Sequence, residues 1–318
     1  MISETTFTRP NRYRSEAPLY YAVYGALQDS DAVVHFAFDG SQWEVKPRFW
    51  TQPWTLATPA MLGQFPASAL IYRQSLITTG EVMASVNLNL NDLRELKGTP
   101  LPQDAAFDEL RLKDVPQGTT VLSGQRIDPL IHFTGRTEVR FSDQPTSVSM
   151  KELSALISHE QQRVKSSTGE VELNYATGLL LLRGAKAQGA SGALASQPQL
   201  DLGIVQINSS LELGHIVAVS LDDRPLETSE RILLQVMSEE QPTNFASSSI
   251  GNGRYRLDEL GTDPWQYRQI AGQIRFQRPD ARELSVKPLD HQGKPAASIG
   301  SAENFKLLPN HLYYLISK

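Results

Sequence analysis

The chain contains no cysteine, and this absence excludes several kinds of chemistry. Disulfide bonds, thiolate metal ligands and a cysteine nucleophile are all ruled out. Because proteins without cysteine occur both inside and outside the cell, the absence does not identify a compartment.

Long apolar runs are also lacking. No run approaches about 18–20 residues, the length that a helix needs to span a membrane. The N-terminus lacks the charged and then apolar pattern of a signal peptide. The sequence as written therefore predicts neither a membrane span nor an export signal.

An excess of positive charge is missing as well. The net charge is −5, the isoelectric point is near 5.7, and Lys and Arg are scattered. Since proteins that bind nucleic acid usually carry a basic patch or stripe, we predict no nucleic-acid partner. The 318 residues, 40% of them hydrophobic and 20% charged, are ordinary for a globular protein of one large domain or two.

Several catalytic motifs are absent too. The sequence has no Gly-x-Ser-x-Gly elbow, no Walker loop and no dinucleotide-binding fingerprint. Its six His have no metal-ligand spacing, so we predict no metal and no cofactor. The polar stretch 166–170 is compatible with weak calcium binding through oxygen ligands or with a plain hairpin turn.

What is present begins in the first line. A short apolar run ends at Glu4, a loop containing Asn11 follows, and the pattern over 15–27 predicts a helix. The stretch 31–38 then has the pattern of a buried strand. This order of strand, carboxylate, loop, helix and strand is typical of a (β/α) barrel, in which catalytic groups lie at the carboxyl ends of the strands.

Aromatic residues are concentrated before Pro66, and three of the four Trp fall within twelve residues. Sugar rings have apolar faces that stack on such side chains, while their hydroxyls bind nearby carboxylates and amides. Phe36 belongs to the same cluster. We predict that substrate is bound by Asn11, His35, Phe38, Asp39, Trp43, Trp50 and Trp54. Aromatics after a strand are also typical core anchors, His35 suits a structural role, and a Glu near a terminus is often a solvated surface residue.

From residue 67 onward, short β runs alternate with turn residues, which favours a β-sandwich. Two helices are expected in this part, over 90–96 and 149–164. A further short helix is expected just before it, over 58–65, starting at Thr58. The predicted strands cover 68–73, 81–88, 136–141, 170–175, 179–183, 202–207, 215–220, 231–236, 269–276, 283–289 and 311–316.

Several stretches resemble one family when taken in order. Those over 2–4, 10–19 and 22–29 resemble the seventh strand and helix of large bacterial glycoside-hydrolase-like proteins, whose TIM barrel carries its nucleophile on strand seven. The stretches 33–38 and 58–73 resemble the eighth strand, the closing helix and the entry to an accessory β domain. The blocks 166–188 and 219–234 resemble motifs of that family's C-terminal region.

The resemblance implies a mainly β protein with a short α/β N-terminal part, in which a β-sandwich region follows the last β/α units of a truncated (β/α)8 barrel. Residues 1–66 would be the barrel remnant and 67–318 the accessory region with two helices. Glu4 matches the nucleophile. The acid/base Glu of this clan ends strand four, which this sequence does not contain, so we expect little or no glycosidase activity from the chain alone.

The implied substrate is a polysaccharide or oligosaccharide, and the full-length parent would be secreted or periplasmic. Further expected partners are a missing upstream catalytic half, or a second copy that associates through the open barrel edge. A non-catalytic carbohydrate-binding or structural β-sandwich module is the alternative.

Overall fold

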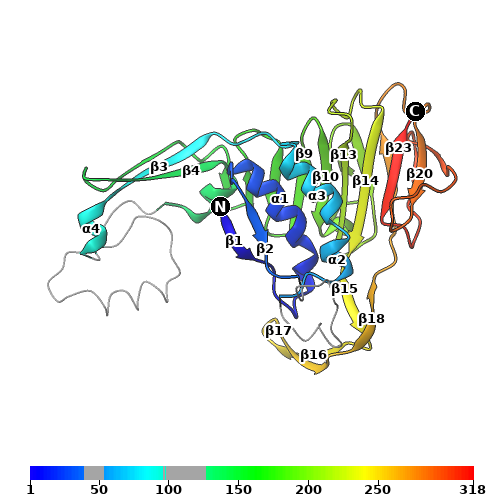
Figure 1. Ribbon diagram of the computed structural model, residues 1–318, viewed down its shortest axis with the longest axis horizontal. Coiled ribbons are helices and arrows are strands. Elements are labelled where there is room, and N and C mark those ends of the chain that lie inside the picture. The colour runs from blue at the N-terminus through cyan, green and yellow to red at the C-terminus, as the bar shows by residue number, and fades with distance from the viewer. Residues whose placement is uncertain (39–53, 96, 98–126) are drawn as a thin grey trace.

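The structure is a computed structural model, and it describes residues 1–38, 54–95, 97 and 127–318. The chain forms a β-rich body from which two extensions project, one at the left of Figure 1 and one at its lower edge. The mainly β class predicted from the sequence is confirmed. None of the helices in the described ranges is long and apolar enough to cross a membrane.

The body is built on a ten-stranded antiparallel sheet. Its strands, in spatial order, are β21 (Gly300–Ser301), β20 (Ser285–Leu289), β23 (Tyr313–Ser317), β14 (Arg231–Ser238), β13 (Gly214–Ser220), β10 (Ala187–Gly192), β9 (Leu179–Arg183), β8 (Val171–Asn174), β7 (Arg163–Lys165) and β6 (Ile157–Ser158). A four-stranded sheet contains β11 (Leu200–Asp201), β12 (Val205–Asn208), β19 (Gln273–Phe276) and β22 (Phe305–Lys306).

The central strands of the large sheet are buried on both faces, and this explains why the sequence of β9 is a continuous run of leucines. Leu179 and Leu181 belong to the core shared with the four-stranded sheet. Leu180 and Leu182 point to the other face, into a core shared with helices. Because successive side chains of a strand alternate between faces, a strand buried on both sides needs apolar residues at every position.

The helical layer comes from the N-terminal part of the chain (Figure 1). It contains η1 (Arg12–Glu16), α1 (Ala17–Leu27), α2 (Pro59–Leu62) and α3 (Phe65–Arg73). Leu19, Val23 and Ile71 pack from α1 and α3 onto the large sheet. At Gly25 a Cβ atom would lie 2.9 Å from the ring of Tyr72, so the absence of a side chain there lets α1 and α3 approach closely.

A parallel pair of strands flanks α1. β1 (Ile2–Thr5) and β2 (Val33–His35) pair with Ile2 opposite Val33 and Thr5 opposite His35, and the register shifts between these positions. Strand, helix and parallel strand form one β/α/β unit, as the sequence predicts. The described parallel sheet has only these two strands, so the structure does not show a barrel.

The two extensions are smaller sheets. The left one contains β3 (Val82–Asn89), β4 (Arg136–Ser142) and β5 (Ser147–Met150), with α4 (Leu90–Arg94) at its end and η3 (Pro129–Phe133) at its base. The lower one, which we call the β15–β18 arm, contains β15 (Glu240–Thr243) paired with β18 (Thr262–Tyr267), and β16 (Ala246–Gly251) paired with β17 (Arg254–Glu259). A short η4 (Leu194–Ser196) follows β10.

Two predicted elements are wrong. The stretch 68–73 was expected to be a strand but lies in α3, where Ala67 and Ile71 are buried one turn apart and Pro66 is tolerated in the first turn. The stretch 149–164 was expected to be a helix but contains β5, β6 and β7. There Ile157 pairs with Val164 across a hairpin, so apolar residues that fit a helical spacing are cross-strand neighbours.

Most other elements lie where the sequence predicts them, including α1, α4, β13 and β14. Thr58 does precede α2, but its side chain makes no capping bond and instead accepts a hydrogen bond from Arg14. The predicted boundary at Pro66 falls in the first turn of α3, and the division into 1–66 and 67–318 stays a prediction.

Candidate functional site

The carboxyl end of the β1–β2 pair joins three stretches of the chain. The Phe36 amide donates to the carbonyl of Thr5 at 3.0 Å, and the Ala37 amide donates to the carbonyl of Trp54 at 3.2 Å. Glu4 lies on this end, exposed, with a left-handed φ of 55° beside the register shift. Glu4, Phe36 and Trp54 are therefore carried by backbone segments that bond to one another, which is the arrangement that places side chains at the mouth of a β/α fold.

Two of the aromatic residues form a surface pair here. The ring centroids of Phe36 and Trp54 are 6.1 Å apart with a tilt of 41°, and the two side chains are 40% and 39% exposed. Large rings that stay half-exposed are available to stack on a ligand. Phe38, by contrast, is partly buried against Leu56 and Met61, so it packs in the interior.

His35 lies on the face of β2 that points toward α1. Its ring packs edge-on between Tyr21 at 5.3 Å and Phe65 at 5.1 Å, measured between centroids. Burial lowers the pKa of His35 and favours the neutral imidazole. Its Nδ1 atom is buried without a hydrogen-bond partner in the part of the chain that the structure describes.

Asn11 has a local structural role. The side-chain oxygen of Asn11 accepts a hydrogen bond from the Tyr13 amide at 2.9 Å and so caps η1. Asp39, Trp43 and Trp50 lie outside the described residues.

Behind the carboxyl end lies a buried arginine that the sequence did not single out. Arg14 is 1% exposed. It donates to the carbonyls of Phe7, at 2.8 Å, and Thr55. It also donates to the Thr58 hydroxyl at 3.0 Å and to Glu240 Oε1 at 3.1 Å. Arg14 therefore ties the loop after β1 and the segment 54–58 to the β15–β18 arm.

Glu240 completes this contact from the arm. Its second oxygen accepts a hydrogen bond from the Ala60 amide at 2.6 Å, at the start of α2. Burial raises the pKa of Glu240, and the neighbouring Arg14 opposes that effect. A helix start and a guanidinium together hold this carboxyl group in place.

Another arginine, in the loop between β1 and η1, lies over an aromatic ring. The Arg9 guanidinium is 4.5 Å from the ring centroid of Trp265 in β18. Burial, followed by the charge of Arg14, lowers the pKa of Arg9 to about 10. Neither residue was predicted as part of a site. The sequence feature that could have pointed to this contact is Trp265, the one Trp outside the N-terminal cluster.

Two sequence blocks of the resemblance have structural explanations. Asp222 accepts hydrogen bonds from the Ser220 and Ser229 hydroxyls at 2.9 and 2.6 Å, and from the Glu230 amide. These bonds lower the pKa of Asp222 to about 2 against the effect of burial. The block fixes the connection between β13 and β14.

The stretch 166–170 is the turn between β7 and β8, which confirms the hairpin interpretation. Its Glu170 accepts from the amide and hydroxyl of Thr78. Across the described ranges, no group of three or more His, Asp or Glu side chains is arranged to hold a metal ion.

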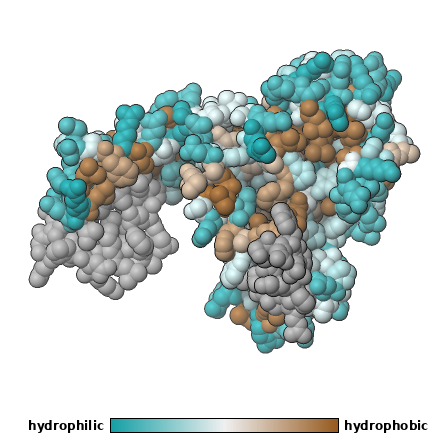
Figure 2. Space-filling model, viewed as in Figure 1, coloured by the Kyte–Doolittle hydropathy of each residue, from teal (hydrophilic) through white to brown (hydrophobic). Residues whose placement is uncertain are grey.

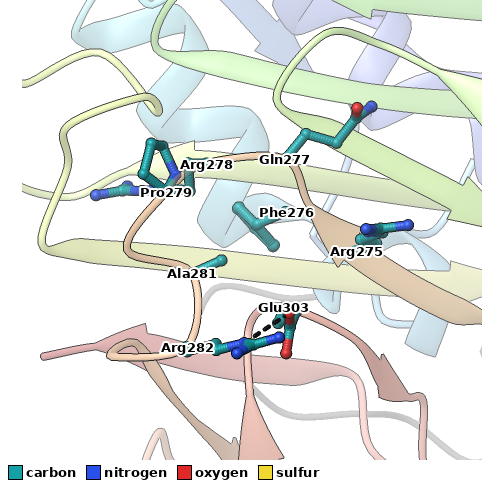
Figure 3. Close-up of a pocket in the computed structure, with 8 residues that line it drawn as sticks. All are labelled: Arg275, Phe276, Gln277, Arg278, Pro279, Ala281, Arg282 and Glu303. Atoms are coloured by element: carbon teal, nitrogen blue, oxygen red, sulfur yellow. Dashed lines mark hydrogen bonds and ion pairs between the residues drawn. The ribbon is translucent and has the colours of Figure 1, made fainter.

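A cavity of about 330 Å³ lies elsewhere, beside β19 (Figure 3). Its Arg278 is engaged by Asp280 and by two backbone carbonyls, and its Arg282 is paired with Glu303 at 2.8 Å. The cavity therefore holds arginines that are already satisfied, together with an exposed Arg275. It offers no carboxylate pair or nucleophile for catalysis.

We compared the chain with family models, curated proteins and solved structures, and none of these comparisons gave a match.

Proposed function

We propose that the chain is the C-terminal part of a glycoside-hydrolase-like protein that acts on a polysaccharide or oligosaccharide, and that the β1–α1–β2 unit is the remnant of its barrel. The observation that carries the proposal is the grouping of Glu4 with the exposed Phe36–Trp54 pair at the carboxyl end of a parallel β/α/β unit. A retaining mechanism needs a carboxylate on one side of the cleft, and exposed aromatic rings next to it offer a surface on which a sugar can stack.

Glu4 would act as the nucleophile of a retaining mechanism, which forms a glycosyl-enzyme bond and needs a second carboxyl group about 5–5.5 Å away. That second group would protonate the leaving oxygen, a contribution typically worth 10²–10⁴-fold in rate. By the resemblance it lies on a strand that this sequence does not contain. Hydrolysis of unactivated glycosides by the chain alone is therefore expected to be negligible.

A glycan-binding module without chemistry is the second candidate. The Phe36–Trp54 pair favours it, because a surface aromatic pair binds sugar rings without any need for a second carboxyl group.

Calorimetric titration with a panel of oligosaccharides tests the shared part of both candidates. We expect binding by the full chain and at least about tenfold weaker binding by the variants F36A and W54A, because each loses a stacking surface. Phe141, a 62% exposed Phe on β4, provides the matched control F141A, which should bind normally. Absence of binding to every saccharide would contradict the proposal.

Activated sugars separate the two candidates. A 2-deoxy-2-fluoroglycosyl fluoride needs no acid catalyst, because fluoride leaves as the carboxylate oxygen of Glu4 bonds to the anomeric carbon. Mass spectrometry should find the adduct on Glu4 and none in E4Q. Sugar binding without an adduct would favour the binding module.

A further inference from the structure

Three buried donor nitrogens at the base of the β15–β18 arm lack an acceptor. They are Nε and Nη1 of Arg9 and Nε1 of Trp265, and none has a hydrogen-bond partner in the part of the chain that the structure describes. Buried donors in native proteins are almost always paired with protein, water or ligand. Their meeting at one place indicates that a group rich in acceptor oxygens belongs there.

The charges around Arg9 are unbalanced. Arg9 and Arg14 are both cationic, and Glu240 is the carboxylate that acts on both. That carboxylate already bonds to Arg14 and to the Ala60 amide, and it forms no bond to Arg9. Among the described residues Arg9 has no carboxylate of its own, and such a partly buried guanidinium favours an anionic ligand, since charge-assisted hydrogen bonds are the strong ones.

The position of Arg9 connects this group to the candidate site. Arg9 belongs to the loop that leaves β1 just after Glu4, and Arg14 bonds both to that loop and to the carbonyl of Thr55, next to Trp54. The Arg9 guanidinium lies over the Trp265 ring, and this cation–π contact keeps the donor nitrogens of the two side chains near each other. Arg14 therefore links the loop that carries Arg9 to the segment that carries Trp54.

We infer that Arg9 and Trp265 bind the carboxylate of an acidic saccharide, such as a uronate residue. This inference rests on the proposed function and specifies the class of saccharide. The arm then has a recognition role: β18 supplies Trp265, and Glu240 on β15 positions Arg14 beside the anion-binding arginine.

Indole N–H signals in an NMR spectrum of the ¹⁵N-labelled full chain test this directly. The chain has four Trp, so four indole peaks are expected, and the peaks lost in W54F and W265F identify Trp54 and Trp265. The probes are D-glucuronate, D-glucose and acetate at matched ionic strength. We expect glucuronate to shift both peaks saturably, and glucose and acetate to bind at least about tenfold more weakly at Trp265.

The variant R9M keeps an apolar stem on the Trp265 ring and removes the charge, so the glucuronate response at Trp265 should be lost. The control R140M removes an exposed arginine of β4 whose side chain is 75% exposed and should leave the response unchanged. If the spectrum shows R9M to be unfolded, R9K replaces it, with binding at least about tenfold weaker because a lysine cannot reproduce the guanidinium donors.

The outcomes separate this inference from the function on which it rests. A glucuronate shift at Trp54 without one at Trp265 would overturn the inference and leave the saccharide proposal standing. Acetate binding as tightly as glucuronate at Trp265 would overturn the saccharide part of the inference. No shift of either peak by any sugar would overturn both.

Discussion

Both faces of β9 are buried, whereas the residues of β1 and β2 are exposed or half-buried. Leu179 to Leu182 alternate between two cores. On β2, His35 packs against Tyr21, while Val34 is 48% exposed. The space-filling view shows the brown apolar surface interrupted by polar residues over the body (Figure 2). Parallel strands are normally covered on both faces.

The difference indicates where the stability of each region originates. The body has a large core of its own, whereas a two-stranded sheet is marginal in water without further support. The β1–α1–β2 unit draws that support from the body through the helical core, the Arg14–Glu240 pair and His215. The His215 ring is fully buried between the hydroxyls of Ser15 and Ser191, each at 2.8 Å. Burial lowers the pKa of His215 to about 3, so it bridges the two regions as a neutral group.

The largest effect is expected where the two regions share a buried charge. The substitution E240A leaves Arg14 buried without its carboxylate, and breaking such a pair typically costs about 3–5 kcal/mol. Urea unfolding followed by circular dichroism measures this loss. The control E212A removes a carboxylate that is 73% exposed and pairs with Arg12 at the surface, so it should cost less than about 1 kcal/mol. Equal losses in both variants would mean that the arm does not support the N-terminal unit.

The next largest loss of stability is expected from a truncation in the core of the body. Leu234 is fully buried in the core between the two sheets, and L234A should lower the free energy of unfolding by about 2–5 kcal/mol. Leu257 on β17 is 39% exposed, so L257A provides a control of the same residue type with an expected change within about 0.5 kcal/mol. A small effect of L234A would show that the core of the body relaxes around the resulting cavity more readily than its burial suggests.

The same contrast explains what could be predicted from the sequence. The strands of the body were found because runs such as 179–183 are apolar at every position and end at turn residues. The helix over 149–164 was wrong because Ile157 and Val164 satisfy both a helical face and a hairpin pair. The strands of the β15–β18 arm were missed because β16 and β17 are exposed on both faces, so no buried apolar face marks them.

The candidate site was predicted only in part, for a different reason. Glu4, Phe36 and Trp54 were singled out because they are close in sequence to the β/α/β pattern, and their role in a site stays a prediction. Arg9 and Trp265 meet through tertiary folding alone, and no local pattern links a loop near the N-terminus to a strand near residue 265. The pairing of Arg14 with Glu240 has the same cause.

A smaller effect, and one that depends on pH, is expected at Glu16, where α1 begins. Burial raises the pKa of Glu16 from 4.5 to about 7, and the hydroxyl of Tyr20 lies one turn further along the same helix. The folded state therefore holds the proton more tightly than the unfolded chain. The stabilisation from Glu16 is complete below pH 4.5 and is lost as the pH rises through about 7.

The substitution E16Q should remove this dependence and should make the protein more stable than the parent above pH 7. Because Glu16 is partly exposed, we expect a difference on the order of 1 kcal/mol, smaller than the full shift would give. Unfolding midpoints measured in urea between pH 5 and pH 8 check this. Parallel curves for the two proteins over that range would contradict it.

The smallest effect on the chain itself is expected on the open face of the parallel pair. The substitution V34S replaces a half-exposed side chain, so the free energy of unfolding should change by less than about 0.5 kcal/mol. If further strands or a second copy cover this face, as the barrel proposal requires, the same substitution places a hydroxyl in an apolar contact and weakens that association. Sedimentation of the parent and V34S over a range of concentrations separates the two effects. A clear loss of monomer stability with no change in association would show that the face is already covered within the chain, which would remove the main physical reason for a missing part of the barrel.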